Sequence, residues 1–445
     1  MDFGSIPFIV WFLPAFLLIY YVIPSDRSRK VVLILGSIGF YAVSYTVWIP
    51  HLLALTCLTL LAYQGVQRFG KPVLAAAVLL FVGILVWNKT SGQLMPGISF
   101  LVFTILALLF DCNRKQMTQT GVLQILSYLL FFPKMLSGPI ARLEDMESKR
   151  VLLMGERNRR IRVGMEYGLV CFIIGLGYKV LLANSLSGLW YDIQTIGFDS
   201  ISTPLAWMGI LGYSMQLYFD FQGYSLMAIG IAKMLGYRLP NNFNSPYLSK
   251  SISEFYRRWH MTLGSWFRDY IYIPLGGSRK GRMRTVINLG IVWILTGLWH
   301  GFGWNFLLWG CFLFFWISVE KLWLRSILEQ HPVLGHIYVC FLIPLSWVFF
   351  ALPELQDIKW CFLRLFAPLV PQDGVNVLAV DYLKYGSMYG PFLLAGVCCI
   401  FPFVERWLKR HYRKWYGIVL LLVIFWFSIY QLSNGLNNPF LYFRF

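Results

Sequence analysis

Long apolar stretches alternate with short polar and mostly basic ones along the whole chain. A helix needs about 20 apolar residues to cross the hydrocarbon core of a bilayer, and several stretches reach or approach that length. Gly and Pro interrupt some of them, which is typical of tilted or re-entrant helices. The pattern therefore predicts roughly eleven to thirteen transmembrane or re-entrant helices. Examples are "IPFIVWFLPAFLLIYYVI", "VVLILGSIGFYAVSYTVWI", "VLAAAVLLFVGILVW" and "GIVLLLVIFWFSIY".

The composition supports the same class of protein. The chain is 58% hydrophobic and only 13% charged, with a mean hydropathy of +0.62, whereas soluble domains are about 25% charged. A soluble globule of 445 residues has no means of hiding so much apolar surface, so lipid is the expected solvent. We therefore expect an all-α, multi-pass protein in the lipid bilayer, organised as one membrane domain over residues 1–445. No internal repeat is visible in the sequence, which disfavours transporter folds built from duplicated halves.

The formal net charge is +18. Nucleic acid is one partner that such a balance suggests, but the basic residues gather between apolar runs, where the positive-inside effect accounts for them. We expect these stretches to be cytoplasmic and close to anionic headgroups, and we expect no nucleic-acid partner. They are "SDRSRK", "ERNRRIR", "RKGRMR" and "ERWLKRHYRK".

A polar segment at residues 238–284 interrupts the apolar pattern in the middle of the chain. Its first part is rich in Pro, Asn and Ser and predicts a loop. Ser251 followed by Glu254 is the pattern of a capping box, so we expect a helix to begin there and to continue to Tyr270. Apolar residues then recur at spacings of three and four, which predicts an amphipathic helix at the membrane interface. Its apolar face consists of Phe255, Trp259, Thr262, Leu263 and Trp266.

Three polar residues stand out because an ionisable side chain at membrane depth is costly and marks a candidate functional site. His300 lies in "LTGLWHGFGWNFLLWG", beside glycines that leave room for another molecule or for close helix packing. We favour a general base over a histidine that only packs. His260 either orients a substrate, assists proton transfer or is an interfacial residue of a basic helix. Asp220 either forms a structural ion pair, with an arginine near His260 as one candidate partner, or orients a histidine.

No metal site and no disulfide framework are expected. The eight cysteines lie mostly inside apolar runs, and none has CxxC spacing. His260 and His300 are 40 residues apart and have no companion ligands at metal-binding spacing. The cysteines are therefore interpreted as small buried hydrophobic residues.

Several segments, taken together, carry a family resemblance. They are "PGISFLVFTILALLFDCNR", "FFPKMLSGPIARLEDM", "GLGYKVLLAN", "YFDFQGYSLMAIGIAKMLGY", "LPNNFNSPYLSKSISEFYRRWHMTLGSWFRDYIYIPLGG", "GLWHGFGWNFLLWG" and "NNPFLYFRF". This set resembles the signatures of the membrane-bound O-acyltransferase (MBOAT) family, and most closely its branch of bacterial alginate O-acetyltransferase membrane proteins. The resemblance covers a family core at about residues 95–310 and the end of the chain.

The resemblance implies a helical fold around a central funnel, with acyl transfer to a hydroxyl and no covalent acyl-enzyme. The near-invariant histidine of the family matches His300, and its second motif residue matches His260. We expect His300 to take the proton of the acceptor hydroxyl as this oxygen attacks a thioester carbonyl. His260 would position the acceptor or the leaving thiol. Further substrate-binding candidates are Asp220, Tyr218 and Asn305, and Arg257, Arg258, Arg268 and Lys280 are expected either to hold a phosphate-bearing donor or to be positive-inside anchors.

The expected donor is cytoplasmic acetyl-CoA or a carrier-protein thioester, with no bound cofactor. An acceptor in an exported cell-envelope polysaccharide would require the acyl group to cross a bacterial inner or cytoplasmic membrane. An accessory periplasmic or extracellular transferase is therefore an expected partner. Two alternatives stay open: D-alanyl transfer to teichoic acid from a carrier-protein thioester, and a transporter or polysaccharide flippase.

Overall fold

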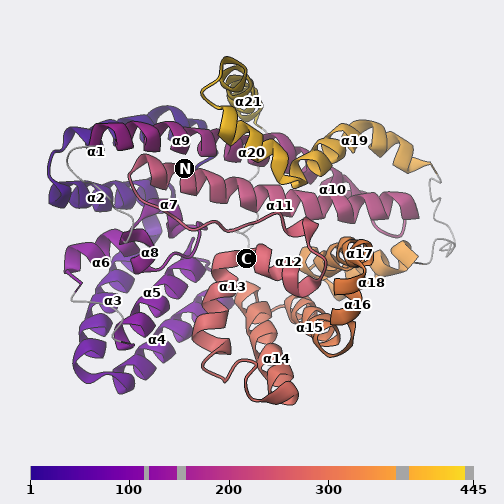
Figure 1. Cartoon of the computed structure of the whole chain (residues 1–445), viewed down its shortest axis with the longest axis horizontal. Coiled ribbons are helices and arrows are strands. Elements are labelled where there is room, and N and C mark those ends of the chain that lie inside the picture. The colour runs from indigo at the N-terminus through magenta and orange to yellow at the C-terminus, as the bar shows by residue number, and fades with distance from the viewer. Residues whose placement is uncertain (1, 115–119, 148–156, 367–379, 436–445) are drawn as a thin grey trace. The chain divides into compact units, whose positions relative to one another are not determined.

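The computed structural model describes residues 2–114, 120–147, 157–366 and 380–435. These residues form helices and connecting loops without a strand, which confirms the predicted all-helical class (Figure 1). Contacts within the chain divide it into two units, which we describe separately. The predicted single membrane domain stays a prediction, and the aromatic tail "NNPFLYFRF" lies outside the described residues.

The first unit comprises the described residues within 1–176, Tyr224–Asn241 and residues 421–435. Three long helices, α9, α11 and α21, continue from one unit into the other. The helices of this unit are η1 (Pro7–Phe12), α1 (Leu13–Val22), α2 (Asp26–Tyr45), η2 (Thr46–Trp48), α3 (Ile49–Phe69), α4 (Lys71–Thr90), α5 (Ile98–Asn113), α6 (Val122–Leu129), α7 (Phe132–Met135), α8 (Leu143–Glu147), α9 (Arg157–Gly177), the later part of α11 (Thr203–Met234) and most of α21 (Trp415–Ser433).

Short helix α7 packs into the first unit through both backbone and side-chain contacts. The N–H of Phe132 donates to Oγ of Ser37 on α2 at 3.2 Å, and the rings of Phe132 and Phe40 lie 5.4 Å apart. Gly97, which precedes α5, has φ of 80°, and a Cβ there would lie 2.5 Å from the carbonyl oxygen of Met135. Both the positive φ and the close approach require glycine at this position.

The second unit comprises the described residues of Gly177–Gly223 and Asn242–Leu420, and it contains every candidate site residue named above. Its helices are η4 (Tyr178–Ala183), α10 (Asn184–Ile196), the first part of α11, η5 (Pro246–Leu248), α12 (Ile252–Arg258), α13 (Met261–Phe267), η6 (Arg268–Tyr272), α14 (Gly281–His300), α15 (Trp304–Val319), η7 (Glu320–Leu324), α16 (Arg325–Gln330), α17 (Pro332–Ala351), α18 (Leu355–Phe366), α19 (Asp381–Ile400) and α20 (Pro402–His411).

Six helices among the described residues are long and apolar enough to cross a membrane, or seven if the bent pair α19 and α20, which meet at 71°, forms one span. Most residues of the apolar windows in α4 and α21 are not buried inside the protein, as expected for helices that face lipid. Other predicted helices are present but are shorter or broken. The six are Asp26–Phe69, Lys71–Thr90, Ile161–Ile196, Trp304–Gln330, Pro332–Ala351 and Trp415–Ser433.

The predicted helix in the middle polar segment begins as expected but is interrupted. Oγ of Ser251 accepts a hydrogen bond from the N–H of Glu254 at 3.0 Å, which confirms the predicted N-cap. The prediction of one continuous helix over residues 254–270 is wrong, because α12 ends at Arg258 and α13 begins at Met261. The residue before α13 has a left-handed backbone, and the apolar spacing gives no sign of this because the residue is not glycine.

Candidate active site

Helices α14 and α15 pack backbone to backbone. A Cβ at Gly297 would lie 2.6 Å from the carbonyl oxygen of Phe306, and a Cβ at Gly310 would lie 2.7 Å from the carbonyl oxygen of Trp293. Real Cβ atoms essentially never come this close, so both positions require glycine. Close helix packing, one of the two roles expected for the glycines near His300, is therefore confirmed for Gly297.

His300 is the last residue of α14, and its side chain is buried. Its ring lies among aromatic rings, with centroid distances of 4.7 Å to Trp299, 4.9 Å to Phe350 of α17 and 5.1 Å to Trp309 of α15. The carbonyl groups at a helix C-terminus carry partial negative charge, and aromatic rings attract cations through their faces. The helix end thus favours a positive charge on this imidazole, as a general base requires when it takes a proton, while burial among the rings disfavours that charge.

His260 lies between α12 and α13 in a left-handed backbone conformation, with φ of 45° and ψ of 52°. Its side chain is only 3% exposed, and its Nδ1 lies 3.1 Å from Oδ1 of Asn242. Burial lowers the pKa of His260 to about 3, so the imidazole is neutral near pH 7. This burial argues against the alternative of an interfacial residue in a basic helix.

The indole ring of Trp299 contacts both histidines. Its centroid lies 6.2 Å from that of His260 and 4.7 Å from that of His300. Phe221 of α11 also places its ring edge-on to His260, at 4.6 Å. The structure therefore brings two residues that are 40 positions apart in the sequence to one aromatic cluster. Trp299 is not among the candidate site residues expected from the sequence. Its position next to His300 in the sequence is the signal that could have identified it.

Asp220 forms a buried ion pair with Lys179. The Nζ of Lys179 in η4 lies 2.5 Å from Oδ1 of Asp220 in α11, and both side chains are at most 8% exposed. The ion-pair interpretation is confirmed, and the partner in this pair is Lys179 and not the candidate arginine. Lys179 lies in the segment "GLGYKVLLAN", and the overlooked signal was a lone cation in an apolar run. Because Phe221 follows Asp220 directly, this ion pair lies in the part of α11 that contacts His260.

Tyr218 and Asn305 are buried and have partners within the second unit. The ring of Tyr218 lies 6.1 Å from that of Trp259 and 5.7 Å from that of Tyr247. Nδ2 of Asn305 donates to the carbonyl oxygen of Phe349 at 3.2 Å, which joins the start of α15 to the end of α17. Their roles in positioning an acceptor stay predictions.

The four basic residues expected to hold a donor do not share one environment. Arg258 pairs with Glu254 at 2.7 Å, and Arg268 pairs at 2.7 Å with the aspartate that follows it. Lys280 is exposed next to the start of α14. Arg257 is also exposed, and it lines a polar pocket.

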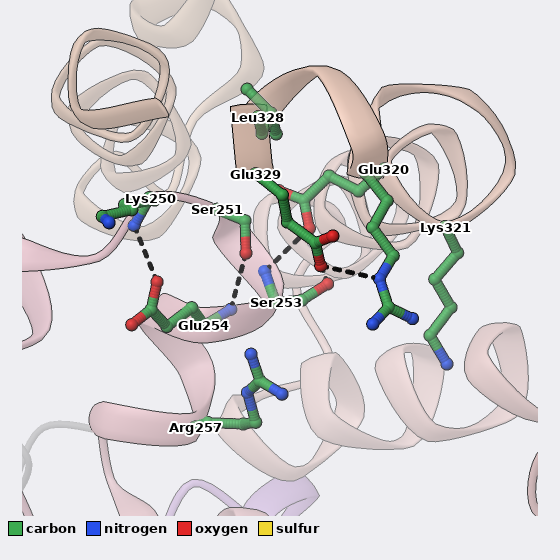
Figure 2. A pocket seen from close by; sticks show the side chains of 10 residues that line it. Lys250, Ser251, Ser253, Glu254, Arg257, Glu320, Lys321, Leu328 and Glu329 are labelled. Carbon is green, nitrogen blue, oxygen red and sulfur yellow. Dashed lines mark hydrogen bonds and ion pairs between the residues drawn. The ribbon is translucent and has the colours of Figure 1, made fainter. Parts of the chain in front are cut away.

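This polar pocket has a volume of about 240 Å³ and lies between α12 and the helical segments that follow α15 (Figure 2). It is lined by basic and acidic side chains together. Of the four basic residues in this lining, the sequence indicates only Arg257 as a candidate. The other three come from a loop and from a segment 60 to 70 residues further along the chain. The charged lining residues are Lys250, Arg257, Lys321 and Arg325 together with Glu254, Glu320 and Glu329.

At one wall of the pocket, Glu320 holds the first turn of α12 (Figure 2). One carboxylate oxygen accepts from the N–H of Ile252, and the other accepts from the N–H and the hydroxyl of Ser253 at 2.9 and 2.6 Å. The first amide groups of a helix have no partner within the helix, so these bonds satisfy them from outside. Since α12 leads directly to His260, Glu320 also fixes the segment that carries this histidine.

We expect Glu320→Ala to lower the free energy of unfolding by about 2–4 kcal/mol, because it leaves buried amide groups at the start of α12 without an acceptor. Thermal unfolding of the purified protein in detergent measures the change. The matched control is Glu329→Ala, which removes an exposed carboxylate from the same pocket, where it pairs with Arg325. Exposed pairs contribute little to stability, so this variant should unfold close to the wild type. Equal shifts for both variants would contradict the role given to Glu320.

The fold and this site define a helical membrane protein with two buried histidines in one aromatic cluster, an arrangement suited to proton transfer away from bulk water. Comparison with known sequences identifies the class: the signature of the MBOAT, membrane-bound O-acyltransferase family matches residues 32–352. The chain belongs to this family and is an O-acyltransferase. The predicted resemblance is thereby confirmed, and the transporter or flippase alternative is disfavoured.

Similar proteins include O-acetylating and D-alanylating enzymes. A probable alginate O-acetylase AlgI of Azotobacter vinelandii is 33% identical over 403 residues, which cover 83% of this chain and 78% of that protein. A peptidoglycan O-acetyltransferase of Helicobacter pylori is 36% identical over 261 residues, covering 56% and 47% of the two chains. A teichoic acid D-alanyltransferase of Bacillus subtilis is 31% identical over 228 residues, covering 48% and 56%.

Proposed function

We propose that this O-acyltransferase moves an acetyl group from a cytoplasmic thioester donor to a hydroxyl, for the O-acetylation of an exported cell-envelope polysaccharide at a bacterial cytoplasmic membrane. The observation that carries the proposal is the 33% identity to a probable alginate O-acetylase over 83% of this chain. The peptidoglycan O-acetyltransferase adds a second relative that is named for O-acetyl transfer to a sugar polymer. The similarity to the D-alanyltransferase covers less of the chain, 48%.

The chemistry follows from the two histidines. His300 takes the proton of the acceptor hydroxyl while the hydroxyl oxygen attacks the thioester carbonyl. A C–O bond forms, and a tetrahedral oxyanion develops. The oxyanion collapses with cleavage of the C–S bond, and the proton held by His300 passes to the leaving sulfur. His260 positions the acceptor or the leaving thiol. Protons and electron pairs balance within this sequence, so it needs no oxidant or reductant.

A thioester donor such as acetyl-CoA carries phosphate groups, and the polar pocket beside α12 is the candidate for holding them. Arg257, Lys250 and Lys321 bring positive charge to it. Guanidinium and ammonium groups bind phosphate through charge-assisted hydrogen bonds. Glu320 accepts hydrogen bonds from the start of α12, and Glu329 pairs with Arg325 at 2.9 Å. These two carboxylates offset part of the positive charge of the pocket.

We expect Arg257→Ala to raise KM for acetyl-CoA by about tenfold with little change in kcat, because a phosphate contact is present before and during the reaction alike. Initial rates at varied acetyl-CoA concentration in proteoliposomes measure both constants. Arg282→Ala is the control, since it removes another exposed cation that does not line the pocket. If both variants raise KM equally, general surface charge and not the pocket attracts the donor.

The donor itself distinguishes acetyl transfer from D-alanyl transfer. Purified protein in proteoliposomes is given radiolabelled acetyl-CoA, or a D-alanyl thioester of a carrier protein, together with a hydroxyl-bearing polysaccharide and an extract of periplasmic proteins. The proposal predicts label in the polysaccharide from acetyl-CoA. Transfer from the carrier-protein thioester alone would replace it with the teichoic-acid alternative.

An acceptor outside the cytoplasmic membrane requires the acyl group to cross the bilayer. We propose that an accessory periplasmic or extracellular transferase accepts the group from this protein and delivers it to the polymer. The proteoliposome assay with and without an extract of periplasmic proteins tests this step. Full transfer to the polysaccharide by the purified protein alone would make such a partner unnecessary.

A further inference from the structure

Asn242 makes the contacts that hold His260 in place. Its side chain is 1% exposed, and its Oδ1 lies 3.1 Å from Nδ1 of His260. The same oxygen accepts from the N–H and the hydroxyl of Thr262 at 3.3 and 2.9 Å. The backbone carbonyl of Asn242 accepts from the N–H of Met261 at 2.8 Å. One asparagine therefore binds the histidine and both residues that follow it.

The loop that carries Asn242 continues this pairing on the other side of the histidine. The N–H of Asn244 donates to the carbonyl oxygen of Arg258 at 2.9 Å. Within the described part of the chain, the residues other than glycine that have positive φ are Ser245 and His260, and they lie on these two paired segments. A left-handed backbone at such residues persists where its surroundings fix it, and it is frequent at functional sites.

The contacts determine which atom of the asparagine faces the imidazole. A backbone N–H can only donate, so the atom that faces the N–H of Thr262 must be the amide oxygen. This oxygen is an acceptor for Nδ1 of His260 as well, so Nδ1 must carry the hydrogen. A neutral imidazole has one ring proton, and Nε2 is then the nitrogen with the lone pair.

We propose that Asn242 is a positioning residue that holds His260 as the Nδ1–H tautomer, so that Nε2 is the atom that accepts a hydrogen bond during acyl transfer. The catalytic part of this inference rests on the proposed function, in which His260 acts beside His300. The tautomer itself depends only on the contacts of Asn242. In the reaction, Nε2 accepts a hydrogen bond from a second hydroxyl of the acceptor, or from the leaving thiol once the proton held by His300 has passed to its sulfur.

Two ion pairs lie on elements that carry or contact His260. On α11, Asp220 pairs with Lys179 and directly precedes Phe221, whose ring contacts His260. On α12, Arg258 pairs with Glu254. On α14, the titratable neighbour is His300, which shares the ring of Trp299.

A first experiment reads the tautomer without any activity. Protein labelled with ¹⁵N in its histidines is reconstituted in bilayers, and the ring nitrogens of His260 are assigned by comparison with His260→Gln. We expect a protonated Nδ1 and an unprotonated Nε2 in the wild type, and mixed tautomers in Asn242→Leu, which has a similar branched shape but no acceptor. A protonated Nε2 in the wild type would overturn the proposal even if acyl transfer proceeds as proposed.

A second experiment uses the pH dependence of acyl transfer. Asn242→Asp keeps the acceptor but places a carboxylate beside Nδ1, which favours the imidazolium and raises the pKa of His260. The wild type should show no loss of rate from His260 between pH 5 and 8, because burial lowers the pKa of this histidine to about 3. Asn242→Asp should lose rate as the pH falls through the raised pKa, with the acid limb at least about one pH unit higher than in the wild type.

Thr262→Val is the matched control. It removes the hydroxyl that also donates to Oδ1 of Asn242 but leaves the contact between Asn242 and His260. We expect the wild-type tautomer and the wild-type pH profile in this variant, even if it unfolds at a lower temperature. A pH profile that moves equally in Thr262→Val and Asn242→Asp would show that Asn242 acts through stability alone and would overturn the proposal. Absence of acyl transfer in the wild type would refute the proposed function, and the tautomer measurement would still decide the rest.

Discussion

His300→Ala is expected to lower kcat/KM for acyl transfer by a factor of about 10²–10⁴, which is the range that a general base contributes. The imidazole lies at the C-terminal end of α14, within 5.1 Å of three aromatic rings measured between centroids. Bulk water, the alternative base, has little access to this position because His300 is only 4% exposed. The variant therefore lacks both the base and a ready substitute for it.

Initial rates in proteoliposomes with labelled acetyl-CoA measure the effect, and thermal unfolding checks the fold. Since alanine leaves a cavity among large rings, His300→Gln is the second variant, with similar volume but no base. His331→Ala serves as the control, because His331 is exposed in a connector between α16 and α17. A folded His300→Gln protein that retains the wild-type rate would remove His300 from the chemistry.

The second large effect is expected at the buried ion pair. Lys179→Met or Asp220→Leu alone should lower the free energy of unfolding by about 3–5 kcal/mol, because each leaves a buried charge without its partner. The double variant should recover most of this loss, since two apolar side chains replace two charges that were both removed from water. The two single variants are therefore expected to be strongly non-additive.

Chemical unfolding of the four proteins in detergent gives the double-mutant cycle. A control cycle on Arg325 and Glu329, an exposed pair at 2.9 Å, should show coupling below about 1 kcal/mol. Additive losses at Lys179 and Asp220 would mean that the charges are solvated and that their contact contributes little. If the double variant is stable but inactive, Asp220 has a role in substrate binding beyond the ion pair.

The sequence predicts the helical class well because apolar length is a direct consequence of the bilayer as solvent. It fails at the break between α12 and α13, because the apolar spacing of three and four continues across the interruption. A left-handed backbone conformation is usually found at glycine or asparagine, but here the residue is His260. Tertiary contacts from Asn242 override the local preference, and no pattern within the segment reveals them.

The candidate site was predicted in part, for a similar reason. His260 and His300 are conspicuous because polar side chains are rare in apolar surroundings. Their partners are less conspicuous. Asn242 lies in a loop that contains many other polar residues, and Glu320 follows an apolar helix, where a carboxylate is expected simply because the apolar segment ends. Which loop returns to which helix is decided by the fold, so the residues that position a histidine are found only in three dimensions.

The backbone at His260 bears on how this protein can be improved by selection. A left-handed conformation costs a residue with a side chain about 1–2 kcal/mol relative to glycine, so the backbone here favours glycine or asparagine over histidine. A variant library screened for thermostability alone would be drawn toward such replacements at position 260 and would lose the imidazole. Engineering of a sturdier enzyme should therefore hold this position fixed or screen each round for turnover as well.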